Sequence, residues 1–437
     1  MVQALYKKYL LCVLVLVGVF STFERFVFAL VLEPIKNELL LTDTQLGLMT
    51  GIAFFAFYAI AGVPIARWAD RGNRVTISAL AVGLCGIMVS LCGLATNFTQ
   101  LLLVRAGVGV GEAGVMPAGQ SLISDYFDRS ERPRALAIYI MFYTISMVAG
   151  YLLGGWLVDS YGWRNTFMII GIPGLVVGLL AKLTLKEPRS LQHVHDQPAA
   201  TDLRTSLKVL LQQATFRQIL ILFCLGYFFN AGVSQWLPTF LIRSYDMSMS
   251  EVGVWLALAF GVFGTVGIYL GGYICSRFAA NNERWQMQFL AITTVLYGIA
   301  NAIAYSSNSK YLSLFCISVG AVLMMMNNGP IFAAIQSLVN DRYRSLAVAI
   351  TFLFGNLVGF GLGPLMLGFI SDALSMTYGD ESLRYALLAF TPGTLLMAYY
   401  FWKVSMTVEA DIRSIELEKS NPTVPHDSGL SKFSSSL

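Results

Sequence analysis

Apolar runs long enough to cross a bilayer recur along almost the whole chain, and they constrain its fold more than any other sequence feature. A helix of about 20 apolar residues spans the hydrocarbon core. Such runs lie near residues 9–32, 44–66, 75–94, 99–124, 135–158, 164–184, 216–241, 250–272, 286–306, 311–338, 345–370 and 383–403. They do not alternate apolar and polar residues as the strands of membrane barrels do. We therefore predict an all-α membrane protein with twelve transmembrane helices.

The composition argues against several other classes of protein. Only 12% of the residues are charged, about half of the roughly 25% found in soluble domains. The net charge of +4 is too small to indicate nucleic-acid binding. The six cysteines lie inside apolar runs without metal-ligand spacing, so we expect no metal and no other cofactor. The histidines lie outside these runs, which argues against an enzyme and leaves a transporter, with a channel or receptor as alternatives.

The glycines of the run 99–124 have a separate interpretation. Gly107, Gly109 and Gly111 resemble part of a dinucleotide-binding fingerprint, which requires a preceding strand in a soluble parallel unit. Here they lie inside a spanning helix. Small residues in such helices predict close helix packing instead.

The distribution of Lys and Arg predicts which side each loop faces. With the amino terminus placed in the cytoplasm, the inner loops contain more basic residues than the outer loops, as the positive-inside rule requires. The inner loops hold Arg67, Arg71, Arg74, Arg129, Arg132, Arg134, Arg277, Arg284, Arg342 and Arg344, and the outer loops hold Lys36, Arg164, Arg243, Lys310 and Arg384. We expect a multi-pass protein of the plasma (inner) membrane with both termini in the cytoplasm.

Related patterns on either side of a polar central segment predict two homologous halves. Gln120-Ser121-Leu122 recurs as Gln336-Ser337-Leu338, and Arg134-Ala135-Leu136-Ala137 recurs as Arg344-Ser345-Leu346-Ala347. The runs 135–158 and 345–370 are each glycine-rich and each lead to an aspartate, Asp159 and Asp372. Such repeats are typical of transporters whose site lies between the halves. We predict six-helix bundles over 1–185 and 216–408, a cytoplasmic linker over 186–215 and a flexible cytoplasmic tail over 409–437.

Four charged residues fall clearly within the predicted spans: Glu24, Arg25, Arg105 and Glu112. Each ionised side chain at mid-bilayer depth costs roughly 2.5–3.5 kcal/mol on insertion scales, so these four should face one another or a wet cavity. Arg105 and Glu112 are about two helical turns apart and share one face. We predict a proton-coupling cluster in which Glu24 is the lead proton site, Glu112 its partner and Arg25 the counter-ion that switches. The alternative is a fixed ion-pair network between two helices.

The loop after the second predicted helix resembles a motif of the major facilitator superfamily. Asp70-Arg71-Gly72-Asn73-Arg74 is similar to its Asp-Arg-x-Gly-Arg loop, with Asn73 in place of the second glycine. The counterpart in the second half, Gly271 to Arg277, keeps glycine and arginine. The resemblance implies the major facilitator fold and a cytoplasmic latch formed by Asp70, Arg71, Arg74, Asp125 and Arg277. The alternative is that these charges only set the topology.

A narrower resemblance is to the Spinster family. It rests on Glu24-Arg25 in the first helix, on Arg105 with Gly109-Val110-Gly111-Glu112-Ala113 in the fourth, and on Ser124-Asp125-Tyr126-Phe127. The first acidic position is more often aspartate in that family. Eukaryotic members export sphingosine-phosphate or lysophospholipids, and the short loops of this chain suit a bacterial member. The resemblance implies a secondary active transporter of an amphiphilic, lipid-like substrate, working by alternating access. With the charged cluster, we predict that this transport is coupled to protons.

The second half lacks charges within its spans and offers neutral polar residues instead. We predict that the substrate contacts Tyr143 of the first half and Tyr227, Asn230, Gln235, Asn327, Asn328 and Asn356 of the second. For any one of these residues a helix–helix hydrogen bond is an equal alternative. The expected partners are a small amphiphile, protons and membrane lipid, with the protein acting as a monomer. The alternative substrates are drugs or small organic anions.

Overall fold

The computed structural model describes residues 2–188, 210–279, 282–327, 329–331, 347, 350–351 and 353–420, without the side chains of 2–4, 70 and 414–420. Every regular element within these residues is a helix, so the all-α prediction is confirmed. The first half contains α1 (Val2–Leu30), α2 (Leu32–Leu39), α3 (Asp43–Thr50), α4 (Ile52–Arg71), α5 (Arg74–Cys92), α6 (Phe98–Glu112), α7 (Val115–Tyr126) and α8 (Arg132–Thr184).

The second half includes two π-helical segments, η2 and η3, which lie within spanning helices. Its elements are α10 (Ala214–Tyr245), α11 (Met249–Leu256), η2 (Ala257–Phe263), α12 (Gly264–Phe278), α13 (Glu283–Ser306), α14 (Lys310–Met325), η3 (Gly355–Phe360), α17 (Gly361–Tyr378), η4 (Gly379–Glu381), α18 (Ser382–Phe390) and α19 (Gly393–Ser420). Segments of π-helix are frequent at functional sites, because the wider turn changes which side chains face a neighbour.

Polar side chains at the helix starts explain where several helices begin. Thr42 accepts a hydrogen bond from Gln45 N at 3.2 Å at the start of α3, and Asn97 accepts one from Gln100 N at 2.9 Å at the start of α6. Asn73 accepts from Thr76 N at 2.8 Å at the start of α5. Asn73 therefore replaces the glycine of the loop motif with an N-cap, which satisfies a backbone donor of the first turn.

Ten described segments are long and apolar enough to cross a membrane. Two of them, Arg132–Thr184 with 53 residues and Gly355–Arg413 with 59, are more than twice the length that a bilayer requires. The first turns at Gly162, whose φ of 75° interrupts the helix. Since each double-length segment accommodates two crossings, the described chain fits the predicted twelve.

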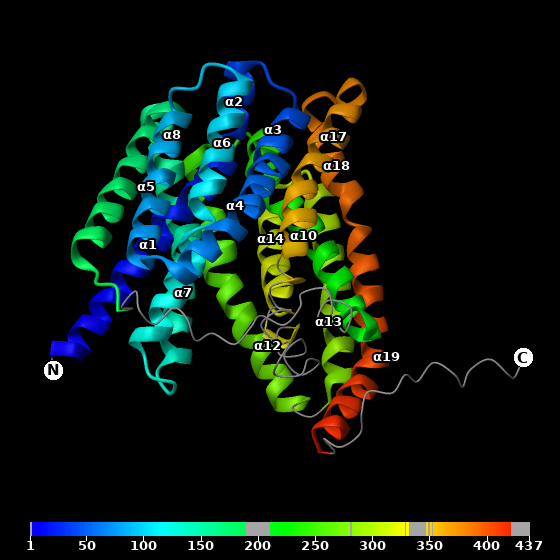
Figure 1. Ribbon diagram of the computed structural model, residues 1–437. Coiled ribbons are helices and arrows are strands. Elements are labelled where there is room, and N and C mark those ends of the chain that lie inside the picture. Colours follow the sequence, from blue (N-terminus) through cyan, green and yellow to red (C-terminus); the bar gives the residue numbers. More distant parts are fainter. Residues whose placement is uncertain are drawn as a thin grey trace, which may run out of the picture.

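The two halves lie side by side, and α1 starts at the same end of the molecule where α19 stops (Figure 1). The start of α1 and the end of α19 lie in the lower part of Figure 1, whereas α2 and the junction of α17 with α18 lie at the top. We call these the termini end and the far end. The domain limits at 185 and 215 stay a prediction, because residues 189–209 are outside the described part.

The carboxyl-terminal helix is longer than the sequence indicated. The predicted flexible tail begins at 409, but α19 continues to Ser420. Val408 is fully buried, and Asp411 Oδ2 accepts a hydrogen bond from Thr215 N at 3.1 Å. These contacts with the start of α10 stabilise a helical turn whose polar composition alone indicated a tail.

Glycines bring helix backbones together, as predicted for the run in α6. A Cβ atom on Gly109 would lie 2.6 Å from the carbonyl oxygen of Phe54, and one on Gly111 would lie 2.8 Å from Cys85 Sγ. No side chain fits at these distances, so α6 packs directly against α4 and α5. This packing holds Glu112, the last residue of α6, close to the aromatic residues of α4.

Candidate functional site

The structure brings the four charged residues of the spanning helices together as two ion pairs. Glu24 and Arg25 are neighbours on α1, and Arg105 and Glu112 lie on α6. Arg105 Nη1 donates to Glu24 Oε2, and Arg25 Nε donates to Glu112 Oε2 at 2.8 Å. Each acid thus pairs with an arginine of the other helix, and the cluster as a whole is neutral.

Aromatic rings from α1 and α4 surround both guanidinium groups. Arg25 Cζ lies 4.7 Å from the ring centroid of Phe54 and 5.0 Å from that of Phe55. Arg105 Cζ lies 4.1 Å from the centroid of Phe28 and 4.9 Å from that of Phe54. Contacts of cations with aromatic faces are most favourable where water is excluded. The ring of Phe54 contacts both arginines, so the two ion pairs belong to one cluster.

The two pairs differ in their access to solvent. The side chains of Glu24 and Arg105 are 2% and 1% exposed, whereas that of Arg25 is 17% exposed. Glu24 Oε1 and Arg105 Nε are buried without a hydrogen-bond partner among the described residues. The Glu24–Arg105 pair is therefore sealed within the bundle, whereas the Arg25–Glu112 pair is partly open on the side of Arg25, with Glu112 only 7% exposed.

A row of aromatic rings continues from Arg25 across the interface between the halves. Phe55 of α4 stacks on Phe360 of η3 with centroids 4.9 Å apart and planes inclined by 24°. Phe360 in turn contacts Tyr227 of α10, edge to face, at 5.1 Å. Gly359 packs against Tyr227 and Phe228 so closely that no side chain would fit there. The site charges in the first half are thus in contact, through Phe55, with the second half.

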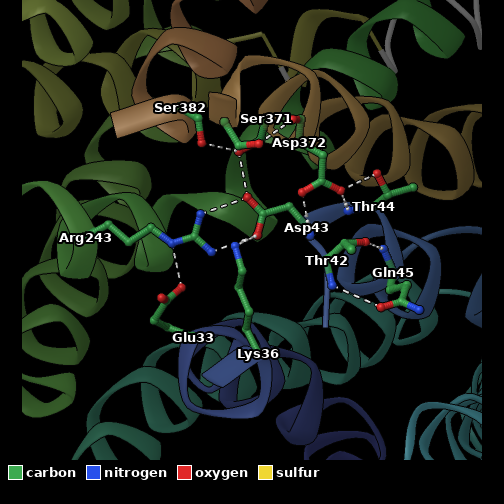
Figure 2. Close-up of polar contacts among 11 residues, drawn as sticks. Glu33, Lys36, Thr42, Asp43, Thr44, Gln45, Arg243, Ser371, Asp372 and Ser382 are labelled. Atoms are coloured by element: carbon green, nitrogen blue, oxygen red, sulfur yellow. Dashed lines mark hydrogen bonds and ion pairs between the residues drawn. The ribbon is translucent and has the colours of Figure 1, made fainter. Parts of the chain in front are cut away.

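A second polar cluster joins the halves at the far end (Figure 2). Asp43, which is 1% exposed, accepts hydrogen bonds from Lys36 Nζ at 2.7 Å and from Arg243 Nη1 and Nη2 at 2.8 Å each. Ser371 Oγ donates to the same carboxylate at 2.6 Å, and Glu33 accepts from Arg243 Nε at 2.6 Å. A buried carboxylate requires such partners, and two of them come from the opposite half.

Two further aspartates hold helix starts across the same interface. Asp372 of α17 accepts from the backbone N–H groups of Asp43 and Thr44 at 3.0 and 2.7 Å. Asp159 of α8 accepts from those of Met249 and Ser250 at 3.3 and 2.8 Å. A carboxylate at a helix start satisfies free donors and interacts favourably with the helix dipole.

Among the described residues, every hydrogen bond and ion pair between the halves lies at the far end. At the termini end, the contacts that the described part of the chain records for the predicted latch residues lie within the first half. Arg74 is fully buried and pairs with Asp125 at 2.7 Å and with Glu187, at the start of the predicted linker. Arg71 and Arg277 are exposed at the ends of α4 and α12. The side chain of Asp70 lies outside the described residues.

Each basic residue assigned to the outer loops is paired with a carboxylate. Lys36 pairs with Asp43, Arg164 with Glu38, Arg243 with Glu33 and Asp43, Lys310 with Glu251, and Arg384 with Glu381. The hydrogen bond from Arg164 to Glu38, which lies outside the spans, lowers the pKa of that carboxyl group below its usual value. The pair is therefore stabilising at neutral pH and is lost only as the pH falls through that lowered pKa. These local pairs leave little free positive charge at the far end.

The predicted substrate contacts have mixed surroundings. Tyr143 is 41% exposed, and Tyr227, Asn230, Gln235 and Asn356 are half-buried. Asn327 makes the helix–helix hydrogen bonds that were the alternative to a substrate contact. Its amide bonds Thr293 at 3.0 Å and Thr294 at 3.2 Å on α13. Asn328 lies outside the described residues.

The interface role of Asp43 and Arg243 was not predicted from the sequence. Arg243 was expected only as an outer-loop charge, and Asp43 was not among the candidate residues. Asp43 and Arg243 lie at the ends of apolar runs and carry opposite charges, and this was the only sequence feature that indicated a possible ion pair. Their pairing could not be derived, because it depends on how α10 of one half meets α3 of the other.

The family model "Major Facilitator Superfamily" matches residues 14–364. The chain belongs to the major facilitator superfamily. Among members, a protein of Mycolicibacterium smegmatis named an MFS-type efflux pump is 32% identical, with 92% of this chain and 93% of that protein covered. Human protein spinster homolog 1 is 26% identical, with 93% and 82% covered.

Solved structures of the superfamily agree with this assignment. A bacterial homolog of the human lysosomal transporter Spinster, in an inward-facing and unoccupied conformation, superposes with a TM-score of 0.82 at 28% identity. The match covers 93% of this chain and 98% of that structure. The predicted Spinster resemblance is confirmed, and this major facilitator protein is a membrane transporter of the alternating-access class.

Proposed function

We propose that this protein is a proton-coupled transporter in which Glu112 and Arg25 form the proton switch. The observation that carries the proposal is the pair of buried ion pairs between α1 and α6, one sealed and one partly exposed. Ionisable residues within spanning helices are rare and most often serve transport or proton transfer.

Which glutamate is protonated more easily depends on the environment of the arginine that loses its partner. Protonating Glu24 would leave the guanidinium of Arg105 unpaired at 1% exposure, a cost of about 3–5 kcal/mol for a broken buried pair. Protonating Glu112 releases Arg25, which is partly exposed and keeps its contacts with Phe54 and Phe55. The switch is therefore Glu112, which differs from the sequence-based expectation that Glu24 leads. Glu24 and Arg105 hold α1 and α6 in register.

The stacked rings supply a route from the switch to the interface. Once Arg25 leaves Glu112, its guanidinium shifts on the faces of Phe54 and Phe55. Phe55 contacts Phe360 of η3 directly, so the shift acts on the contact between the halves. In this scheme, protonation of Glu112 changes the free energy needed to separate the far-end contacts, and that change is the coupling.

The proposed substrate is an amphiphile of the lysophospholipid or sphingolipid type. The first half presents an ion-pair cluster with Arg25 partly exposed, and the second half presents Phe360, Tyr227 and neutral polar residues. An ionic head group suits the first surface and an acyl chain the second. Relatives named spinster homolog 1 agree with the Spinster resemblance, which implies a lipid-like substrate. The alternative substrates stay drugs or small organic anions.

The proposed setting is the plasma (inner) membrane, with both termini in the cytoplasm and the protein acting as a monomer. The pairing of every outer-loop base with an acid supports this orientation, since unpaired bases are then concentrated at the termini end. The far-end contacts correspond to a state open toward the cytoplasm.

The experiment is uptake of labelled lysophosphatidylcholine into proteoliposomes with and without an imposed pH gradient. We expect gradient-stimulated uptake by the wild type, and uptake without stimulation by Glu112→Gln. Glu24→Gln should fold less well because it breaks the sealed pair. Asp246→Asn, exposed at the end of α10, is the control and should behave as the wild type. Equal stimulation of wild type and Glu112→Gln would reject the switch, and a lack of uptake by the wild type would reject the substrate.

A further inference from the structure

A small cavity lies inside the second half, between α10, η2, α13 and α14. Its volume of about 20 Å³ is enough for one water-sized group. Its polar lining comes from Asn230, Ser234, Tyr297, Asn301 and Tyr305. No charged residue lines it, and the remaining wall is apolar. Whatever occupies this cavity is therefore small, uncharged and polar.

Two atoms of the lining are buried without a hydrogen-bond partner among the described residues: Asn230 Oδ1 and the Tyr305 hydroxyl. Tyr305 as a whole is 1% exposed. Ser234 Oγ, by contrast, donates to the carbonyl of Ala231 at 3.2 Å. Buried polar atoms are rarely left unpaired, and a native exception calls for a missing partner. The missing partner must donate to an amide oxygen and pair with a phenol.

The cavity adjoins the interface between the halves. Tyr227, Asn230 and Ser234 follow one another at helical spacing and lie on one face of α10. Tyr227 contacts Phe360 of the aromatic row. On the other side, Phe260 of η2 lines the cavity, and the next residue, Gly261, packs against Val148 of α8. The cavity thus begins at Asn230, one helical turn along α10 from Tyr227 of the aromatic row.

We propose that this cavity binds an uncharged hydroxyl group of the transported amphiphile. The hydroxyl donates to Asn230 Oδ1 and accepts from the Tyr305 hydroxyl, which satisfies both unpaired atoms with one small group. A water molecule takes this place when no substrate is bound. A methyl or a charged group does not fit, because the first leaves both atoms unpaired and the second lacks a counter-charge. This inference rests on the proposed lysolipid substrate and adds that a free hydroxyl is recognised.

The test compares uptake of lysophosphatidylcholine with uptake of its 2-deoxy analogue, which lacks only the free hydroxyl. We expect the KM of the wild type to be about 3- to 10-fold lower for the hydroxyl-bearing lipid, the size of one neutral hydrogen bond. Tyr305→Phe should raise that KM toward the value for the deoxy lipid, because the substrate hydroxyl then keeps only its bond to Asn230, and the difference between the two lipids should narrow. Asn230→Leu, which removes the acceptor at similar size, should do the same.

Tyr245→Phe is the matched control, because its hydroxyl bonds the carbonyl of Ser307 on the same helix bundle, outside the cavity. It should leave both KM values unchanged. If the wild type takes up both lipids with equal KM, the cavity holds only structural water and the inference is wrong. If neither lipid is taken up, the proposed substrate class is wrong and the hydroxyl site falls with it.

Discussion

Asp159 and Asp372 occupy equivalent places in the two halves, and each caps a helix of the opposite half. Asp159 accepts from the first turn of α11, and Asp372 accepts from the first turn of α3. The residues before these turns, Ser248 and Thr42, each accept a bond from their own helix, from Glu251 N and Gln45 N. The far-end closure is thus built twice from one pattern, as the repeat in the sequence suggests.

The equivalent contacts extend to the glycines one turn earlier. A Cβ on Gly155 would meet the carbonyl of Met249, and one on Gly368 would meet the carbonyl of Asp43. The two closures differ in charge. Asp43, at the start of α3, pairs with Arg243 and Lys36, whereas the equivalent position of α11 is Met249.

Removing an aspartate cap should favour separation of the far end. Asp372→Ala leaves the backbone donors of Asp43 and Thr44 without their acceptor, and we expect a loss of about 1–3 kcal/mol from the closed state. The measurement is the distance between spin labels on α2 and α18, which should show a larger long-distance population. Asp380→Ala, exposed at the same end, is the control. An unchanged distance distribution would show that the cap is not needed for closure.

Replacing the glycines of the far-end interface by alanine should also favour separation of the far end, because the added methyl groups clash with the opposite half. Gly155→Ala and Gly368→Ala place a methyl group against backbone of the opposite half, where no flexible side chain can move aside. We expect faster modification of a cysteine introduced at Asn356 by a reagent added from the far end. Gly272→Ala is the control, because nothing lies within 4 Å of its added Cβ. Equal modification rates in all variants would contradict the direct contact.

Breaking the sealed pair should destabilise the first half. Arg105→Met leaves Glu24 buried without its partner, and we expect a loss of about 3–5 kcal/mol in the free energy of unfolding. The double variant Glu24→Leu with Arg105→Met should recover most of that loss, because an apolar pair needs no counter-charge. Unfolding of the purified protein in denaturant measures both. A double variant no more stable than Arg105→Met would show that Glu24 is not the relevant partner.

Removing the Phe360 ring should uncouple transport from proton binding. Phe360→Ala removes the ring that contacts both Phe55 and Tyr227, so the switch should still titrate while gradient-stimulated uptake falls. We expect at least a roughly tenfold drop in stimulation with substrate binding retained, about 1.4 kcal/mol of lost coupling. Phe369→Ala, 58% exposed on α17, is the control. Normal stimulation in Phe360→Ala would exclude this route.

Much of the architecture was predictable, because a bilayer imposes a length and a composition on every spanning segment. The apolar runs, the repeat and the four charges within the spans follow from that constraint. The helix limits were less predictable: α19 continues to Ser420, and Asp411 within it bonds the start of α10, a contact that local polarity does not indicate.

The sequence by itself determined that this chain crosses a membrane repeatedly, that its halves are related and that Glu24, Arg25, Arg105 and Glu112 must find one another. The reason is energetic, since an unpaired charge in hydrocarbon is costly wherever it lies. Only the tertiary structure decided which acid pairs with which arginine, that one pair is sealed and the other partly exposed, and that Asp43 meets Arg243. Those outcomes depend on the rotation and depth of packed helices, which residue spacing along one chain does not fix.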